Sequence, residues 1–147
     1  MREHRIDGIR EGGMFTVHGQ WQIDITPPNV FVNLVGAFNC EGMTALEQEA
    51  RQKWLNYNPG QLYGAVINLS QFEMTTSDSI EALKDYFSDM EKRGYRRIDY
   101  IGIDALSRKI INELWSQSDI QVQLYLDVAA YLSQHPSHRG AAEWLTE

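Results

Sequence analysis

The sequence predicts an α/β fold: a mixed, mostly parallel sheet of about five or six strands, with an N-terminal hairpin and helices packed on it. Short apolar, β-branched runs alternate along the chain with longer stretches whose apolar residues recur every three or four positions, as in βαβ units. The chain has 147 residues, of which 43% are hydrophobic, so it can bury the core of one ordinary domain.

The composition excludes several classes of protein. The formal charge of −7 repels phosphate backbones and argues against nucleic-acid binding. Cys40 is the one cysteine, which excludes an intrachain disulfide and a cysteine metal cluster. No run approaches the roughly 18 apolar residues of a membrane span. Residues 1–13 form a charged leader without the apolar core of a signal peptide. We therefore expect a cytoplasmic protein whose residues 14–147 form a single domain.

The N-terminal part predicts a hairpin followed by a central strand. Residues 14–17 and 22–25 are typical of two short strands, with a glycine-containing turn between them. Pro27 and Pro28 then interrupt the pattern, because proline donates no backbone hydrogen bond. Residues 30–35 are almost continuously apolar, as in a strand that is buried on both faces.

The middle of the chain alternates helix and strand. An apolar stripe predicts an amphipathic helix over residues 43–57, and residues 63–69 form the next buried-strand pattern. A second helix begins within residues 75–79 and ends before Gly94, a residue suited to a helix C-cap. Residues 98–103 complete this unit as a third apolar strand.

The C-terminal part predicts a helix over residues 106–115, a strand over residues 122–126 and a short closing helix over residues 141–145. His135 and His138 lie between the last two, with a proline between them. A single helix that binds zinc places its histidines four residues apart, so we interpret this pair as part of a solvated loop and expect no metal.

Few residues indicate chemistry. The chain has no glycine-rich phosphate loop, and no nucleophile–base pair stands out, so we expect no catalytic residues and no cofactor. An acidic row is interpreted as a solvated face, with a docking surface for a basic partner as the alternative (Asp78, Glu81, Asp85, Asp89). A basic cluster is interpreted as surface charge that partly complements the end of a helix, with anion binding as the alternative (Lys92, Arg93, Arg96, Arg97). The four tryptophans are interpreted as core residues, with a ligand cavity as the alternative (Trp21, Trp54, Trp115, Trp144).

One segment carries a resemblance. Residues 65–83 read AVINLSQFEMTTSDSIEAL: an apolar strand, the sequence Asn68-Leu69-Ser70 at its end, a short apolar stretch, and a helix start. This order resembles the central strand–loop–helix of the STAS domain, the module of sulfate transporters and anti-sigma factor antagonists. The resemblance places Asn68-Leu69-Ser70 at a strand-end turn and Ser77 on the serine that those antagonists have phosphorylated by a partner kinase.

The resemblance implies a non-catalytic regulatory module. It would bind a protein partner through the loop and helix start formed by Thr75, Thr76, Ser77, Asp78 and Ser79, with Ser77 as a phosphoacceptor. Thr76 and Ser79 stand where phosphorylatable members carry aspartate and glycine, and a serine at this place also suits helix capping, so both roles of Ser77 stay open.

A second resemblance leads to a different function. Gly36-Ala37-Phe38-Asn39 and the ending Ala141-Ala142-Glu143-Trp144-Leu145 look like the divergent STAS group called SpoIIAA-like, which is similar in outline to the lipid-carrying CRAL-TRIO fold. It implies, as the alternative, a carrier or sensor of a small apolar ligand held between sheet and helices. The sequence leaves open whether the chain forms a homodimer.

Overall fold

The computed structural model describes residues 19–74, 78–102 and 105–146, with backbone alone at residues 74, 78–83 and 105–107. The elements in chain order are β1 (Gln20–Thr26), β2 (Asn29–Phe38), α1 (Cys40–Trp54), β3 (Gly64–Met74), α2 (Asp78–Lys92), β4 (Arg97–Ile101), α3 (Ala105–Trp115), β5 (Gln121–Tyr125), α4 (Val128–Gln134), and two short 3₁₀ helices, η1 (Pro136–His138) and η2 (Glu143–Leu145). The predicted leader (1–13) and the predicted strand at 14–17 lie outside these ranges.

The described strands form one five-stranded sheet in the order β1-β2-β3-β4-β5. β1 runs antiparallel to β2, and every other neighbouring pair is parallel. This confirms the mixed, mostly parallel sheet. Each parallel connection contains a helix, as βαβ units require.

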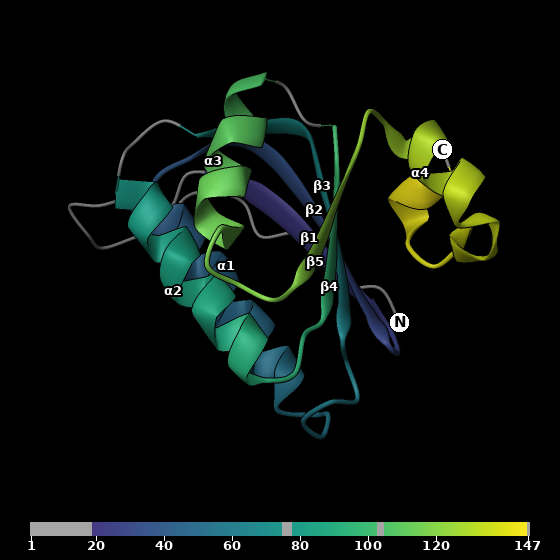
Figure 1. Ribbon diagram of the computed structural model, residues 1–147, viewed down its shortest axis with the longest axis horizontal. Coiled ribbons are helices and arrows are strands. Elements are labelled where there is room, and N and C mark those ends of the chain that lie inside the picture. The colour runs from purple at the N-terminus through teal and green to yellow at the C-terminus, as the bar shows by residue number, and fades with distance from the viewer. Residues whose placement is uncertain (1–18, 75–77, 103–104, 147) are drawn as a thin grey trace.

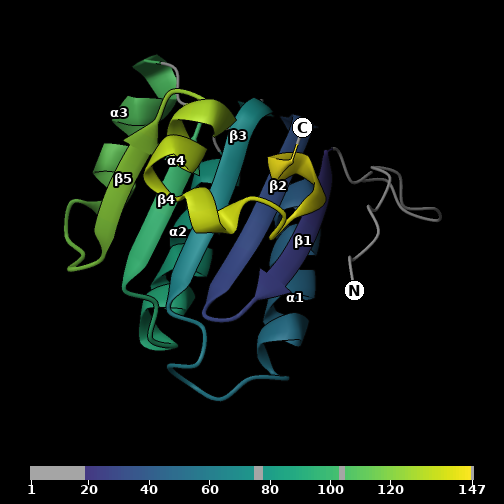
Figure 2. The ribbon, with the colours of Figure 1, turned by 90° about the vertical axis from the view of Figure 1, so that its right-hand side faces the viewer.

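The sheet is covered on both faces. Helices α1, α2 and α3 lie on one face, and the chain after β5 crosses the other (Figure 1, Figure 2). The larger core fills the space under α1–α3. A smaller core lies on the opposite face, where Tyr131, Trp144 and Leu145 pack with Phe31, Val66 and Ile101 from the sheet. We call residues 128–145 the C-terminal cover.

The sequence analysis missed the hairpin that β1 forms with β2. β1 pairs with β2 from Gln20↔Val35 to Thr26↔Asn29, so the strand predicted at 22–25 pairs with the following strand. Pro27 and Pro28 form the turn of this hairpin and do not separate two units. A turn position suits proline because it requires no ladder hydrogen bond from the backbone nitrogen.

The helix-side core confirms the interpretation of the tryptophans. Trp21, Trp54 and Trp115 are at most 7% exposed and belong to this core, and Trp144 belongs to the smaller one. Trp115 also donates a hydrogen bond from Nε1 to the Tyr100 hydroxyl at 2.9 Å, which satisfies the indole nitrogen in a buried place.

The sequence analysis missed α4 and gave the wrong form to the last helix. Asp127 caps α4 by accepting a hydrogen bond from the Ala130 backbone nitrogen at 2.8 Å. The residues predicted as a helix at 141–145 contain instead the single 3₁₀ turn of η2. Helix α4 is seven residues long, too short to show a clear amphipathic period.

Candidate functional site

The segment predicted to bind a partner, residues 75–79, follows β3 in the sequence and includes the start of α2. β3 ends at Met74 and α2 begins at Asp78. Residues 75–77, which include Ser77, lie outside the described part of the chain. Asp78 and Ser79 are the first two residues of α2 and are described by their backbone alone.

The predicted strand-end turn at residues 68–70 is wrong, because β3 continues through it to Met74. Pairing with β4 stops at Asn68↔Ile101, while pairing with β2 continues after a shift of register. The side chain of Asn68 occupies the place where the strands separate. Its amide donates to Asn33 Oδ1 at 3.0 Å, and its Oδ1 accepts from the Ser70 nitrogen at 3.1 Å and hydroxyl at 2.6 Å.

The side chain of Asn68 therefore makes hydrogen bonds at the place where the regular backbone hydrogen bonding between the strands is interrupted. It is 8% exposed, so its polar atoms need such partners. The result is a β-bulge, after which β3 continues to pair with β2 but no longer pairs with β4.

Gly102 directly follows β4, on the other side of the place where β3 and β4 stop pairing. Its backbone nitrogen donates to the Tyr125 carbonyl at 2.9 Å, and its φ is +78°. A Cβ at this position would lie 2.6 Å from Ser70 Cα, so the close approach of the two strand ends depends on glycine.

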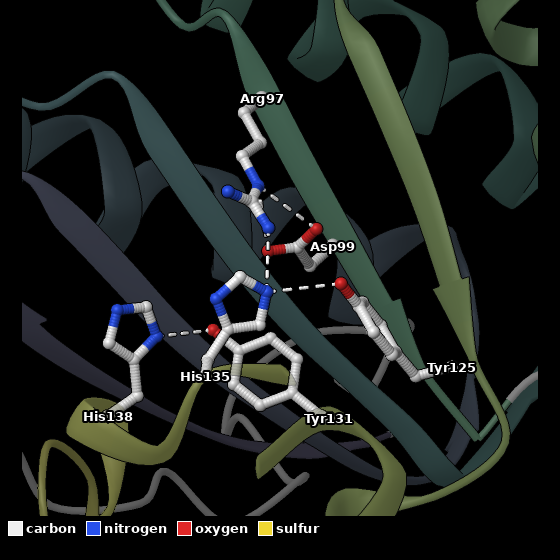
Figure 3. A network of polar contacts seen from close by, with 6 residues as sticks. All are labelled: Arg97, Asp99, Tyr125, Tyr131, His135 and His138. Atoms are coloured by element: carbon white, nitrogen blue, oxygen red, sulfur yellow. Dashed lines mark hydrogen bonds and ion pairs between the residues drawn. The ribbon is translucent and has the colours of Figure 1, made fainter. Parts of the chain in front are cut away.

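A second polar cluster lies between the sheet and the C-terminal cover, on the face of the sheet opposite to α1–α3 (Figure 3). Asp99 on β4 has a side chain that is 4% exposed, and the guanidinium of Arg97 contacts its two oxygens at 3.3 and 3.2 Å. Burial raises the pKa of Asp99, and the charge of Arg97 opposes that shift. The Asp99 that interrupts an apolar strand pattern is thus a buried ion-pair partner.

Two histidines of the cover complete this cluster. Arg97 Nη2 lies 2.7 Å from His135 Nε2, and the Tyr125 hydroxyl lies 3.1 Å from the same nitrogen. The Tyr131 hydroxyl lies 2.6 Å from His138 Nδ1. The two imidazole rings stack with centroids 5.1 Å apart and an angle of 12° between their planes. The prediction of a solvated loop is therefore wrong, because both histidines are half-buried and engaged.

The cluster has no metal-site character in the described part of the chain. No group of three or more histidine, cysteine or acidic side chains is placed there to hold a metal ion. We name the six residues the sheet–cover cluster: Arg97, Asp99, Tyr125, Tyr131, His135 and His138. An acidic residue inside an apolar strand was the signal in the sequence, because such a group needs a buried partner.

Several of the charged side chains that the sequence singled out contact other parts of the protein. Arg93 donates to the Trp54 carbonyl at 3.0 Å and lies over its ring, whereas Arg97 belongs to the sheet–cover cluster. In the acidic row, Asp89 forms an ion pair with Arg51 of α1, and Asp85 is exposed. The interpretation as surface charge alone is wrong for Arg97, which is bound to the cluster.

Glu47 is a buried carboxyl between α1 and α2. It is 6% exposed, and its Oε1 has no hydrogen-bond partner. Burial raises the pKa of Glu47 from 4.5 to about 7, with Asp85 and Asp89 adding to the rise and Arg51 opposing it.

Because the pKa of Glu47 is raised, we expect the free energy of unfolding to fall as the pH rises. Between pH 4.5 and about 7 the unfolded chain releases a proton that folded Glu47 keeps, so stability is full below this window and reduced above it. We expect Glu47→Gln to raise the free energy of unfolding by about 2 kcal/mol above neutral pH, and to have little effect at the acid end of the window. Urea unfolding at several pH values measures this. The exposed Glu113→Gln is the control, and an equal effect at all pH values would contradict the assignment.

Three cavities are formed by described residues, and one of them lies beside α1. The one lined by Trp54, Tyr57, Leu62 and Tyr95 measures about 10 Å³, which is room for about one water molecule. Open hollows of about 450 and 460 Å³ lie on the surface, along α3 and between β1 and the cover. Among the described residues, no helix combines the length and the apolar character that crossing a bilayer requires.

Comparison with known proteins finds similarity in structure alone. No protein-family model matches the chain, and no curated protein matches its sequence. The fold is similar to the anti-sigma factor antagonist SpoIIAA in its unphosphorylated form, with a TM-score of 0.55, 12% identity, and coverage of 79% of this chain and 96% of that one. It is also similar to the Bacillus cell fate determinant SpoIIAA in its phosphorylated form, with a TM-score of 0.52, 12% identity, and coverage of 71% and 89%.

These matches cover most of both chains. The chain therefore has the fold of the SpoIIAA anti-sigma factor antagonists, the STAS-type fold that its strand–loop–helix segment resembles.

Proposed function

We propose that this protein is a non-catalytic regulatory module of the cytoplasm that binds a protein partner through residues 75–79. The observation that carries the proposal is the fold, which is shared with an anti-sigma factor antagonist solved both with and without phosphate. We take residues 14–147 as the single domain that performs this function, with residues 1–13 as its leader.

The position of Ser77 supports a switch by phosphorylation. Ser77 directly precedes Asp78, the first residue of α2. Free backbone amides and the positive end of the dipole favour a phosphate at the start of a helix. The carboxylate of Asp78 opposes it by repulsion between like charges. A partner that binds the start of α2 would therefore meet a different charge in each state of Ser77.

The test is the denatured intact mass of the protein purified from its own cells. We expect a fraction of the chains to be heavier by one phosphate and Ser77→Ala to abolish that fraction. Ser88→Ala is the matched control, because Ser88 is an exposed serine farther along the same helix. Phosphate that persists in Ser77→Ala, or a chain that never carries it, would reduce Ser77 to a capping residue.

A further inference from the structure

The C-terminal cover is fastened to the sheet by a cluster that contains two titratable rings. Its apolar contacts are those of the smaller core, where Tyr131 and Leu145 are fully buried. Thr26 of β1 donates a hydrogen bond to the Ala141 carbonyl at 3.4 Å, and His135 contacts Arg97 of β4 and Tyr125 of β5 (Figure 3). The titratable part of this polar attachment is therefore the Nε2 nitrogen of His135.

The geometry fixes the protonation state of His135. A guanidinium group has donors and no acceptor, so the contact of 2.7 Å requires a lone pair on His135 Nε2. His135 is then neutral, with its hydrogen on Nδ1. A proton on Nε2 would place an N–H group against the guanidinium and replace a hydrogen bond by repulsion between two cations.

The charged and titratable groups around the histidines come from four elements. Arg97 and Asp99 lie on β4, Tyr125 on β5, and Tyr131 on α4, and His138 faces His135 from η1. Asp99 is the one anion of this set, and Arg97 already contacts both of its oxygens. A proton on each imidazole would leave three cations and one anion in a half-buried cluster.

The pKa shifts agree with this picture. Burial lowers the pKa of His135, and the charge of Arg97 lowers it further. Burial lowers the pKa of His138 as well, His135 and Arg97 add to the fall, and Asp99 opposes it. Folding of the cover onto the sheet thus disfavours protonation of both rings.

We propose that the C-terminal cover is a pH-sensitive latch, which is closed on the sheet while His135 and His138 are neutral and opens when they take up protons below about pH 6. Opening would bare the sheet residues of the smaller core, among them Phe31, Val66 and Ile101. This inference does not depend on the proposed function of residues 75–79.

The direction of the effect follows from linkage. The open cover has histidines with ordinary pKa values near 6.5, whereas the closed cover has lowered ones, so the closed state is fully favoured above about pH 6.5 and loses ground as the pH falls. Each unit by which the pKa of a histidine is lowered corresponds to about a tenfold increase in the opening constant once the pH is below both values.

Hydrogen–deuterium exchange of the full chain tests the latch. Protection factors of residues 128–145 are measured between about pH 7.5 and about pH 5, with intrinsic rates from the unfolded chain at each pH. We expect protection of the cover to fall by about tenfold or more toward the acid end, while β3 in the same samples stays protected. Unchanged protection of the cover, or an equal fall in β3, would overturn the proposal.

Two further measurements identify the groups responsible. His135→Gln offers Arg97 an acceptor that does not titrate, so its cover should lose less protection at acid pH than that of the unaltered protein, with His138 as the remaining titrating ring. NMR titration of the imidazoles in the unaltered protein serves if His135→Gln loosens the cover at every pH. The midpoint of His135 must then lie below about 6.5 and coincide with the loss of protection, and a midpoint above that value contradicts the latch.

Discussion

Gly102→Ala is expected to lower the free energy of unfolding by about 3 kcal/mol. The backbone of Gly102 has a φ of +78°, and a side chain in the left-handed region costs about 1–2 kcal/mol. The added Cβ would also lie 2.6 Å from Ser70 Cα and 2.8 Å from Ser70 N. These are backbone atoms, so no side-chain rotation can relieve the clash. Overpacking of this kind adds about 1–3 kcal/mol. Urea unfolding measures the change.

Gly60→Ala separates the two contributions. Gly60 has a similar φ of +85°, but nothing lies within 4 Å of the Cβ that would be added. We expect this control to cost about 1 kcal/mol, from the backbone alone. Equal losses in the two variants would mean that Ser70 and Gly102 are not in close contact, and the description of the place where β3 and β4 stop pairing would then be wrong.

Tyr131→Ala is expected to cost about 3–5 kcal/mol, as other buried aromatic truncations do. Tyr131 is fully buried, stacks on His135 with centroids 4.7 Å apart, and meets the edge of Tyr125 at 5.1 Å. Its removal takes away the largest buried side chain of the cover after Trp144 and leaves His138 Nδ1 without the hydroxyl partner. The loss is measured by urea unfolding, together with hydrogen exchange of residues 128–145.

Tyr63→Ala is the matched control for this truncation. Tyr63 is 46% exposed, so the same change in side chain should cost less than about 1 kcal/mol. Tyr131→Phe retains the ring and should cost about 1 kcal/mol, for the hydrogen bond to His138. A loss in Tyr131→Ala no larger than in Tyr63→Ala would contradict the view that Tyr131 anchors the cover.

The sequence predicted the sheet and its main helices because burial imposes clear periods on them. The strands β2, β3 and β4 are buried on both faces and read as continuous apolar runs, and α1 and α2 show one apolar stripe each. The hairpin of β1 and β2 was missed because a proline pair marks a turn without indicating which strands it joins. The extension of β3 was missed because it depends on side-chain hydrogen bonds of Asn68, which no period records.

The candidate sites were predicted unequally for a related reason. The segment from Thr75 to Ser79 came from the order of residues along one stretch, which a sequence displays directly. The sheet–cover cluster joins Arg97 and Asp99 to His135 and His138, which are some forty residues away. Their meeting depends on where the chain crosses the second face after β5, and local patterns contain no information on that.

Native mass spectrometry of the protein taken from its own cells is the most direct test of the central claim, that this protein works by binding a protein partner at residues 75–79. We expect a complex with a second protein, lost or weakened in Ser77→Asp and retained in Ser88→Asp, whose added charge lies on an exposed part of the same helix. A bare chain, a homodimer alone, or a bound small organic molecule that Ser77→Asp does not displace would contradict it.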